Sequence, residues 1–201
     1  MEVKVTQAQV PGLFTVRDLK VRSGEKVLIQ GPSGQGKTTL LHLIGGILRP
    51  SSGEVKVDGI PLYDLGDREL SQFRRHRIGL IYQKLNLIEH LSVRENLELL
   101  KTSADAEDIL KDLGLESSAD KWASVLSLGE QQRVAVGRVL LQKPDLILAD
   151  EPTSSLDRGN ADTVMKLLVK AAAGKTLIAV SHDERVEKHF DRVISLKEIL
   201  A

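Results

Sequence analysis

The apolar residues of this chain fall into short runs, and segments with helical character separate the runs. Each run is compact and rich in strand-forming residues, as expected for strands that are buried on both faces. The runs of this kind are Val27–Gln30, Ile78–Gln83, Leu146–Asp150, Thr176–Ser181 and Arg192–Leu196. Strands that alternate with helices in this way are typical of a parallel sheet covered by helices. The pattern therefore predicts an α/β fold with a mainly parallel sheet.

A second group of strands is predicted in the first third of the chain. These segments are bounded by turns and favour an antiparallel layer; they are Val3–Gln9, Thr15–Val21 and Ser52–Gly59. The middle of the chain has no convincing strand, and Ser92 and Glu95 have the spacing of a capping box at the start of a helix. We therefore expect one unit in which residues 1–83 and 137–201 form the core with an antiparallel β subdomain. Residues 84–136 are expected to form a short helical subdomain.

Composition limits the classes of protein that fit. With 201 residues and 41% apolar content, the chain can bury one substantial core but not two ordinary domains. Its 28 basic side chains are balanced by 28 acidic ones, which argues against a nucleic-acid partner. It has no cysteine, so disulfides, thiolate metal sites and thiol nucleophiles are excluded.

No segment of the sequence has the features of a secretory signal or a membrane span. The N-terminus lacks a basic start followed by an apolar stretch. The longest apolar stretches, such as Leu40–Leu48, reach about half of the ~20 residues needed to cross a bilayer. We therefore expect a cytoplasmic protein whose membrane crossing, if any, is supplied by another chain.

A glycine-rich segment between a predicted strand and a predicted helix matches G-x-x-x-x-G-K-[ST]. It comprises Gly31, Pro32, Ser33, Gly34, Gln35, Gly36, Lys37, Thr38 and Thr39. In such a loop the backbone N–H groups surround the phosphates of a nucleotide at a helix N-terminus. Lys37 would add a positive charge near the β and γ phosphates, and the Thr38 hydroxyl would bind Mg²⁺. The alternative is a glycine turn that caps an ordinary helix, but the flanking strand and helix favour a phosphate loop.

Two acidic residues follow the apolar run that ends at Ala149. Because ligands of open α/β sheets gather at the carboxyl ends of strands, Asp150 and Glu151 are placed where a bound nucleotide would lie. We interpret Asp150 as a Mg²⁺ ligand and Glu151 as the base that polarises the attacking water. Acidic residues also end strands and cap helices for structural reasons, and without the phosphate loop that reading would be preferred. The motifs together predict a phosphate-loop NTPase core.

The segment from Leu126 to Arg133 reads LSLGEQQR and resembles the LSGGQ signature of ATP-binding-cassette (ABC) proteins. The resemblance extends through essentially the whole chain. Gln83 matches the Q-loop of that family, Asp157 matches the D-loop, and His182 matches the switch histidine. Each of these landmarks occurs once and in the order of the family.

The resemblance implies a role for each matching residue. Ser127, Gly129 and Glu130 would act on the ATP held by the phosphate loop of a partner subunit, and Asp157 would communicate between subunits. Gln83 would contact Mg²⁺ and report to a membrane partner, and His182 would hydrogen-bond the γ-phosphate. Ser127 and Glu130 also form a capping box that opens a helix, and we expect both readings to hold.

Within the family, residues 74–97 and the LADEPTSSLD segment look like the ATPases of lipoprotein-releasing, macrolide-export and cell-division systems. That branch implies an ATP-hydrolysing subunit that dimerises around two ATP molecules, with itself or with a related chain. It would drive a separate transmembrane permease or FtsX-like or MacB-like subunit at the inner face of the cell membrane. An alternative is an ABC ATPase that regulates a membrane-spanning partner without transporting a substrate. Leu128 departs from the family pattern, which has a glycine there.

The sequence has no clear match for the aromatic residue that stacks on adenine in this family. Val10, Pro11 and Gly12 occupy the corresponding region, and Phe14 lies within a predicted strand and is expected in the core. We therefore predict weak selection between bases, with GTP hydrolysed at a rate comparable to ATP.

Two readings from other classes remain open at this point. A small-molecule kinase would use the phosphate loop but would give the segment from Leu126 to Arg133 no purpose. A nucleotide sensor without hydrolysis would not need Glu151 and His182. Measuring ATPase activity with and without a membrane partner distinguishes these readings.

Overall fold

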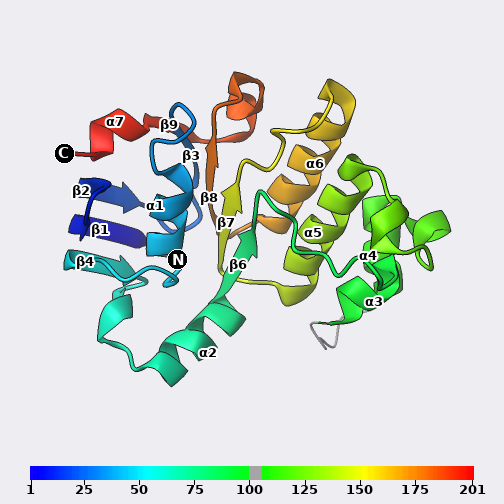
Figure 1. Cartoon of the computed structure of the whole chain (residues 1–201), viewed down its shortest axis with the longest axis horizontal. Helices are drawn as coiled ribbons and strands as arrows, with labels where there is room; N and C mark the ends of the chain where they lie inside the picture. Colours follow the sequence, from blue (N-terminus) through cyan, green and yellow to red (C-terminus); the bar gives the residue numbers. More distant parts are fainter. Residues whose placement is uncertain (100–105) are drawn as a thin grey trace.

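A computed structural model describes residues 1–99 and 106–201 of the chain. Two β-sheets and a group of helices are arranged side by side, with the larger sheet in the middle (Figure 1). Residues 100–105, which belong to the predicted helical subdomain, lie outside the described part of the chain.

The central sheet has five parallel strands in the order β6-β7-β8-β3-β9. Their bounds are β3 Lys26–Gln30, β6 Ile78–Ile81, β7 Leu146–Asp150, β8 Thr176–Ser181 and β9 Arg192–Ser195. The apolar runs in the sequence are continuous because both faces of the sheet are covered. Leu146 and Leu148 of β7 face one core cluster, whereas Ile147 and Ala149 face the other. The predicted α/β fold with a parallel sheet is confirmed.

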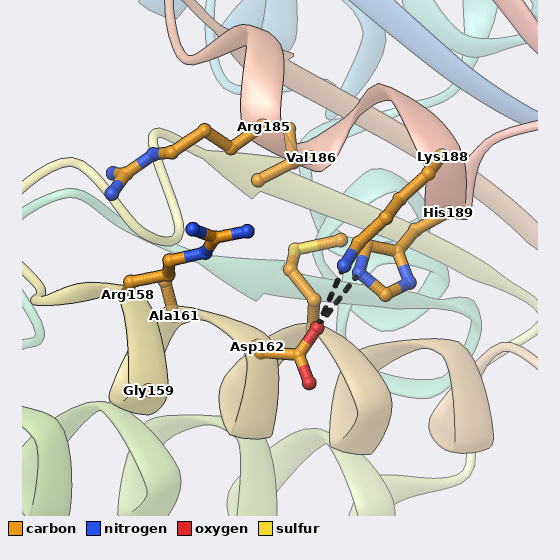
Figure 2. Close-up of a pocket in the computed structure, with 9 residues that line it drawn as sticks. Arg158, Gly159, Ala161, Asp162, Arg185, Val186, Lys188 and His189 are labelled. Carbon is orange, nitrogen blue, oxygen red and sulfur yellow. Dashed lines mark hydrogen bonds and ion pairs between the residues drawn. The ribbon is translucent and has the colours of Figure 1, made fainter.

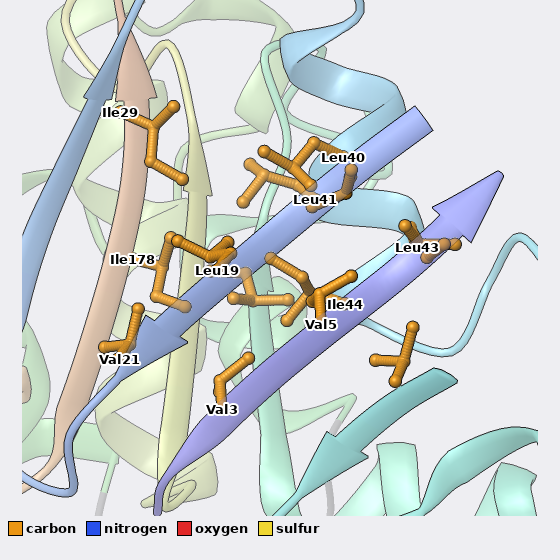
Figure 3. Close-up of a cluster of buried hydrophobic side chains, with 14 of the residues drawn as sticks. Val3, Val5, Leu19, Val21, Ile29, Leu40, Leu41, Leu43, Ile44 and Ile178 are labelled. Atoms are coloured by element: carbon orange, nitrogen blue, oxygen red, sulfur yellow. The ribbon is translucent and has the colours of Figure 1, made fainter. Parts of the chain in front are cut away.

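The smaller sheet is antiparallel, as predicted, with the order β2-β1-β4-β5. Its strands are β1 Val3–Val10, β2 Phe14–Val21, β4 Ser52–Val57 and β5 Ile60–Pro61. Along β1, alternate side chains are buried, as expected for a sheet with only one face on the core. Figure 3 shows this face, with Val3 and Val5 of β1 directed toward the leucines of the first helix.

Seven α-helices are found among the described residues: α1 Lys37–Ile44, α2 Asp67–Arg77, α3 Val93–Glu98, α4 Ala106–Leu113, α5 Leu128–Gln142, α6 Arg158–Ala171 and α7 Leu196–Ile199. Short 3-10 helices cover η1 Leu62–Asp64, η2 Glu116–Ser118, η3 Ala123–Val125 and η4 Glu184–His189. Helix α1 packs between the two sheets, and α3 to α6 lie on the opposite side of the central sheet (Figure 1). Helix α5 is continuous across residue 137, so the predicted boundary of the helical subdomain falls inside a helix. None of the helices in the described ranges combines the length and apolar character that a bilayer span needs.

The strand order places the functional segments together. Strand β8 lies between β3 and β7, so the loops that follow these strands leave the same edge of the sheet next to one another. The loop after β3 is the glycine-rich segment, β7 ends at Asp150, and β8 ends at Ser181. The carboxyl edge of the sheet is therefore the place where the candidate residues meet.

Candidate functional site

The glycine-rich loop, residues 31–36, connects β3 to α1. Gly34 and Gly36 have φ angles of 79° and 90°, a left-handed conformation that glycine adopts without strain. A Cβ atom on Gly36 would lie 2.5 Å from the ring of Phe14. Phe14 is buried in β2, as the sequence predicted, and its ring packs against the loop at Gly36. Only glycine satisfies both constraints at position 36.

The side chain of Lys37 is held inside this loop. It is 6% exposed, and its ammonium donates to the carbonyl oxygens of Gly31, at 2.7 Å, and Pro32, at 3.1 Å. The same ammonium lies 3.2 Å from Oε1 of Glu151. A buried ammonium needs partners of this kind because burial without them is costly. The loop therefore presents a fixed positive charge at its centre.

Thr38 and Asp150 form a second contact between the loop and the sheet. The Thr38 hydroxyl donates to Oδ2 of Asp150 at 2.8 Å. Burial raises the pKa of Asp150, although the Thr38 hydrogen bond acts in the opposite direction. The other carboxylate oxygen, Oδ1, is buried, and residues 1–99 and 106–201 offer it no hydrogen-bond partner. A buried acceptor without a donor is unusual, and a carboxylate and a hydroxyl side by side are oxygen ligands suited to Mg²⁺.

Glu151 has a strained backbone and a carboxylate with several partners. Its φ angle of 46° is uncommon for a residue with a side chain, and its N–H donates to the carbonyl of Val180 at 2.9 Å. Ser181 Oγ donates to Oε2 at 3.0 Å, and His182 Nδ1 lies 2.9 Å from Oε1. Burial acts to raise the pKa of Glu151, but the bonds from His182, Ser181 and Lys37 outweigh it and hold the pKa below its usual value. The carboxylate is therefore ionised at neutral pH.

Ser181 is a site residue that the sequence reasoning missed. It is fully buried, and its Oγ also accepts the N–H of Asp183 at 3.0 Å. In the register of the parallel sheet, Asp150 pairs with Val180, so the residues that follow, Glu151 and Ser181, lie beside each other. A polar residue at the end of a buried strand is the sequence signal for this role. That signal is useful only when the order of the strands is known.

A cavity of about 310 Å³ joins most of the predicted residues at the carboxyl edge of the sheet. It is lined by Leu13, Ser33, Gly34, Gly36, Lys37, Thr38, Thr39, Gln83, Asp150, Glu151 and His182. Gly31, Pro32 and Gln35 belong to the loop but do not line this cavity. Leu13 was not predicted, and its side chain is exposed at the rim, in the turn between β1 and β2.

The signature residues lie at the start of α5, outside this cavity. Ser127 caps the helix, accepting the N–H of Glu130 at 3.4 Å, and Glu130 Oε2 accepts the N–H of Ser127 at 2.8 Å. The predicted capping box is therefore present. Gly129 has a packing role as well, since a Cβ atom there would lie 2.8 Å from the side chain of Asn160.

Asp157 caps the start of α6 and also lies outside the cavity. Its Oδ1 accepts the N–H groups of Gly159, at 2.9 Å, and Asn160, at 3.0 Å. The Asn160 amide donates to Asp157 Oδ2 at 2.6 Å, and its Oδ1 accepts from Arg133 at 3.3 Å. Asn160 thus links the signature helix to Asp157 within one chain, a contact that no sequence pattern indicated.

The strand, glycine loop and helix, with an acidic pair on a neighbouring strand, define a phosphate-loop nucleotide hydrolase. Residues 15–154 match a family model described as "ABC transporter". The lipoprotein-releasing system ATP-binding protein LolD of Chromohalobacter salexigens is 39% identical over 192 residues, covering 90% of this chain and 81% of its own. The uncharacterized ABC transporter ATP-binding protein MJ0796 of Methanocaldococcus jannaschii is 41% identical over 196 residues, covering 90% and 83%.

A solved structure is similar over nearly the whole chain. It is described as a dimeric, post-hydrolysis state of the ATP-binding cassette MJ0796 bound to ADP and Pi. Its TM-score is 0.83 at 36% identity, and the match covers 96% of this chain and 94% of the other. The chain belongs to the ABC transporter family and is an ATP-hydrolysing, nucleotide-binding subunit.

Proposed function

We propose that two copies of the nucleotide-binding subunit enclose two ATP molecules and that their closure drives a separate membrane protein. The proposal rests on one observation: within one chain, the candidate residues lie in two separate places. Lys37, Glu151 and His182 meet around one cavity, whereas Ser127 opens a helix that does not reach it. A second subunit would bring such a helix N-terminus to the nucleotide, where exposed N–H groups favour an anion.

Binding of ATP would rearrange the contacts of Lys37. Its ammonium lies 3.2 Å from the Glu151 carboxylate, and a phosphate oxygen would compete for the same charge. When Lys37 turns to the β and γ phosphates, Glu151 loses one of its partners and becomes available to a water molecule. The exposed side chain of Leu13, at the rim of the cavity, would contact the base through apolar surface alone. Such a contact gives little discrimination between adenine and guanine.

Mg²⁺ fits the oxygen atoms of this site. Thr38, Asp150 and Gln83 all line the cavity, and the buried Oδ1 of Asp150, which has no partner in the described part of the chain, is an acceptor available for a cation or for its bound water. When bound, Mg²⁺ supplies charge neutralisation for the phosphate oxygens. Thr38, Asp150 and Gln83 would contact the ion or its bound water molecules.

Hydrolysis would use Glu151 as general base. Its ionised carboxylate accepts a proton from water as the water oxygen forms a bond to the γ-phosphorus. The bond between the γ-phosphorus and the bridging oxygen breaks, and its electron pair stays on ADP. His182, whose side chain is half exposed at the cavity, would donate a hydrogen bond to the γ-phosphate and stabilise the transferring group.

The membrane partner would be coupled to the nucleotide through Gln83. This residue lines the ATP cavity and also a second cavity of about 500 Å³, where Leu85, Leu87 and Leu128 contribute apolar groups. Trp122 and Val125 are exposed in the same part of the chain, and exposed apolar groups mark interaction surfaces. We infer that a permease or a FtsX-like or MacB-like subunit docks there, which would hold this chain at the inner face of the cell membrane.

The proposal is tested by replacing Glu151 with Gln and measuring ATP binding and turnover. Glu151→Gln is expected to keep ATP binding and to lose almost all hydrolysis. Glu98→Gln is a matched control, since Glu98 is an exposed glutamate of α3 with no ion pair among the described residues. Normal turnover by Glu151→Gln would refute the assignment of the base. Stimulation of the wild-type rate by the membrane subunit would support coupling, and an unchanged rate would contradict it.

A further inference from the structure

A third cavity lies away from the ATP site, between α6 and η4. Its volume is about 650 Å³, within the range of small-molecule sites. It is lined by Arg158, Gly159, Ala161, Asp162, Met165, Arg185, Val186, Lys188 and His189. Figure 2 shows the guanidinium groups of Arg158 and Arg185 on one side of this pocket, and Asp162, Lys188 and His189 on the other. The proposed ATP chemistry uses none of these residues.

The charges that line the pocket are predominantly positive. No ion pair joins Arg158 to any residue in the described ranges. Arg185 donates from Nε and Nη2 to Asp183, both at 2.8 Å. Its Nη1 has no hydrogen bond to the described part of the chain, so it remains available as a donor. The Asp183 carboxylate, which Figure 2 does not draw, compensates the charge of Arg185. The positive charge on this side that has no ion-pair partner in the described ranges is therefore that of Arg158.

On the opposite side of the pocket, several basic side chains share the carboxylate of Asp162. Asp162 lies 3.0 Å from the ammonium of Lys188 and 2.7 Å from that of Lys166, and its other neighbour is His189 Nε2 at 3.7 Å. Asp162 is the only acidic residue among those that line the pocket. Its ion pairs in the described part of the chain are with these groups and not with Arg158.

The state of His189 is consistent with a positive surrounding. Burial lowers the pKa of His189, and the positive charges of Lys188 and Lys166 lower it further, while Asp162 raises it. The imidazole is therefore mainly neutral at pH 7. An anion bound in the pocket would favour the protonated form of His189, so the ring signals of His189 should report binding.

We propose that the pocket between α6 and η4 binds a small amphipathic oxoanion. Its carboxylate or phosphate head would lie between Arg158 and Arg185, because guanidinium groups match the planar, bidentate geometry of such heads. Its aliphatic part would lie along the apolar wall near Ala161 and Val186. An occupant would join the segment that follows Asp157 to the segment that follows His182. It would thus connect two loops of the ATPase at a position that ATP does not reach.

The test is an NMR titration of the histidine ring signals in the full chain, with hexanoate and hexyl phosphate as probes. The sequence has five histidines, and His182 reports the ATP cavity while His189 reports this pocket. We expect a saturable shift of His189 and a higher midpoint of its titration. A better response to hexanoate would identify a carboxylate site, and a better response to hexyl phosphate a phosphate site.

Two variants and a salt control make the outcome decisive. Arg158→Gln is expected to weaken binding at least about tenfold, the effect of losing one charged hydrogen-bond donor. Arg68→Gln, at an exposed arginine of α2, should bind as the wild type does. The proposal is overturned if His189 does not respond, if NaCl at equal ionic strength gives the same shift, or if Arg158→Gln binds normally. Because the titration needs no ATP, its failure would leave the proposed ATPase mechanism standing.

Discussion

Ser181 provides the sharpest test of how the catalytic base is held. In the structure, four donor groups surround the Glu151 carboxylate: the Ser181 hydroxyl at 3.0 Å, His182 Nδ1 at 2.9 Å, the His182 N–H at 3.4 Å and the Lys37 ammonium at 3.2 Å. ATP is proposed to take Lys37 and His182 for its phosphates. The Ser181 hydroxyl would then be the remaining side-chain donor to the base.

Ser181→Ala should therefore reduce kcat rather than ATP binding. A hydrogen bond to a charged group is worth about 1.5–3 kcal/mol, which corresponds to a fall in kcat of about 10- to 150-fold if the whole loss appears in the transition state. No water can replace the hydroxyl easily, because Ser181 is fully buried. KM for ATP should stay within about twofold of the wild type, since the lost group does not contact the nucleotide.

The pH dependence gives a second readout for the same variant. The Ser181 hydrogen bond helps to hold the pKa of Glu151 below its usual value, because it favours the ionised form. Its loss raises that pKa, so the acid limb of the kcat profile should move to higher pH. Ser181→Thr keeps the hydroxyl and should restore most of the activity, while thermal unfolding checks that both variants are folded. An unchanged kcat and an unchanged acid limb in Ser181→Ala would refute the reasoning.

Three further predictions concern the nucleotide. Lys37→Ala should abolish ATP binding in a calorimetric titration, because the phosphates lose their central charge, and normal affinity would be incompatible with the site described. His182→Ala should lower the steady-state rate by about 10²-fold or more, the scale of removing one transition-state donor, whereas a change below threefold would exclude that role. GTP should be hydrolysed at a rate comparable to ATP, because Leu13 offers the base only apolar contact, and a strong preference for ATP would show that a base-specific group has been overlooked.

The local motifs made much of the site predictable. A glycine loop needs glycine where the backbone is left-handed, so Gly36 and the residues after it could be assigned from spacing alone. The acidic pair followed from its position after a buried strand. The capping box of Ser127 and Glu130 was predicted for the same reason, since both partners lie within one helical turn.

The residues that were missed depend on contacts between distant segments. Ser181 reaches Glu151 only because β7 and β8 are neighbours in the sheet, and Leu13 reaches the cavity through the turn between β1 and β2. The contact of Gly129 with Asn160 requires α5 to pack on α6. No pattern within a single segment carries this information, and the same limit applies to the boundary that falls within α5.

The shared ATP site is tested most directly by the mass of the Glu151→Gln protein in solution. With saturating ATP and Mg²⁺, multi-angle light scattering should give the mass of two chains, and without nucleotide the mass should fall. Adding Ser127→Ala should weaken this dimer while leaving the ATP affinity of the single chain unchanged, because Ser127 would contact only the partner's nucleotide. The account would be contradicted if the protein bound ATP normally but kept the mass of one chain. It would also be contradicted if Ser127→Ala left the stability of the dimer unchanged.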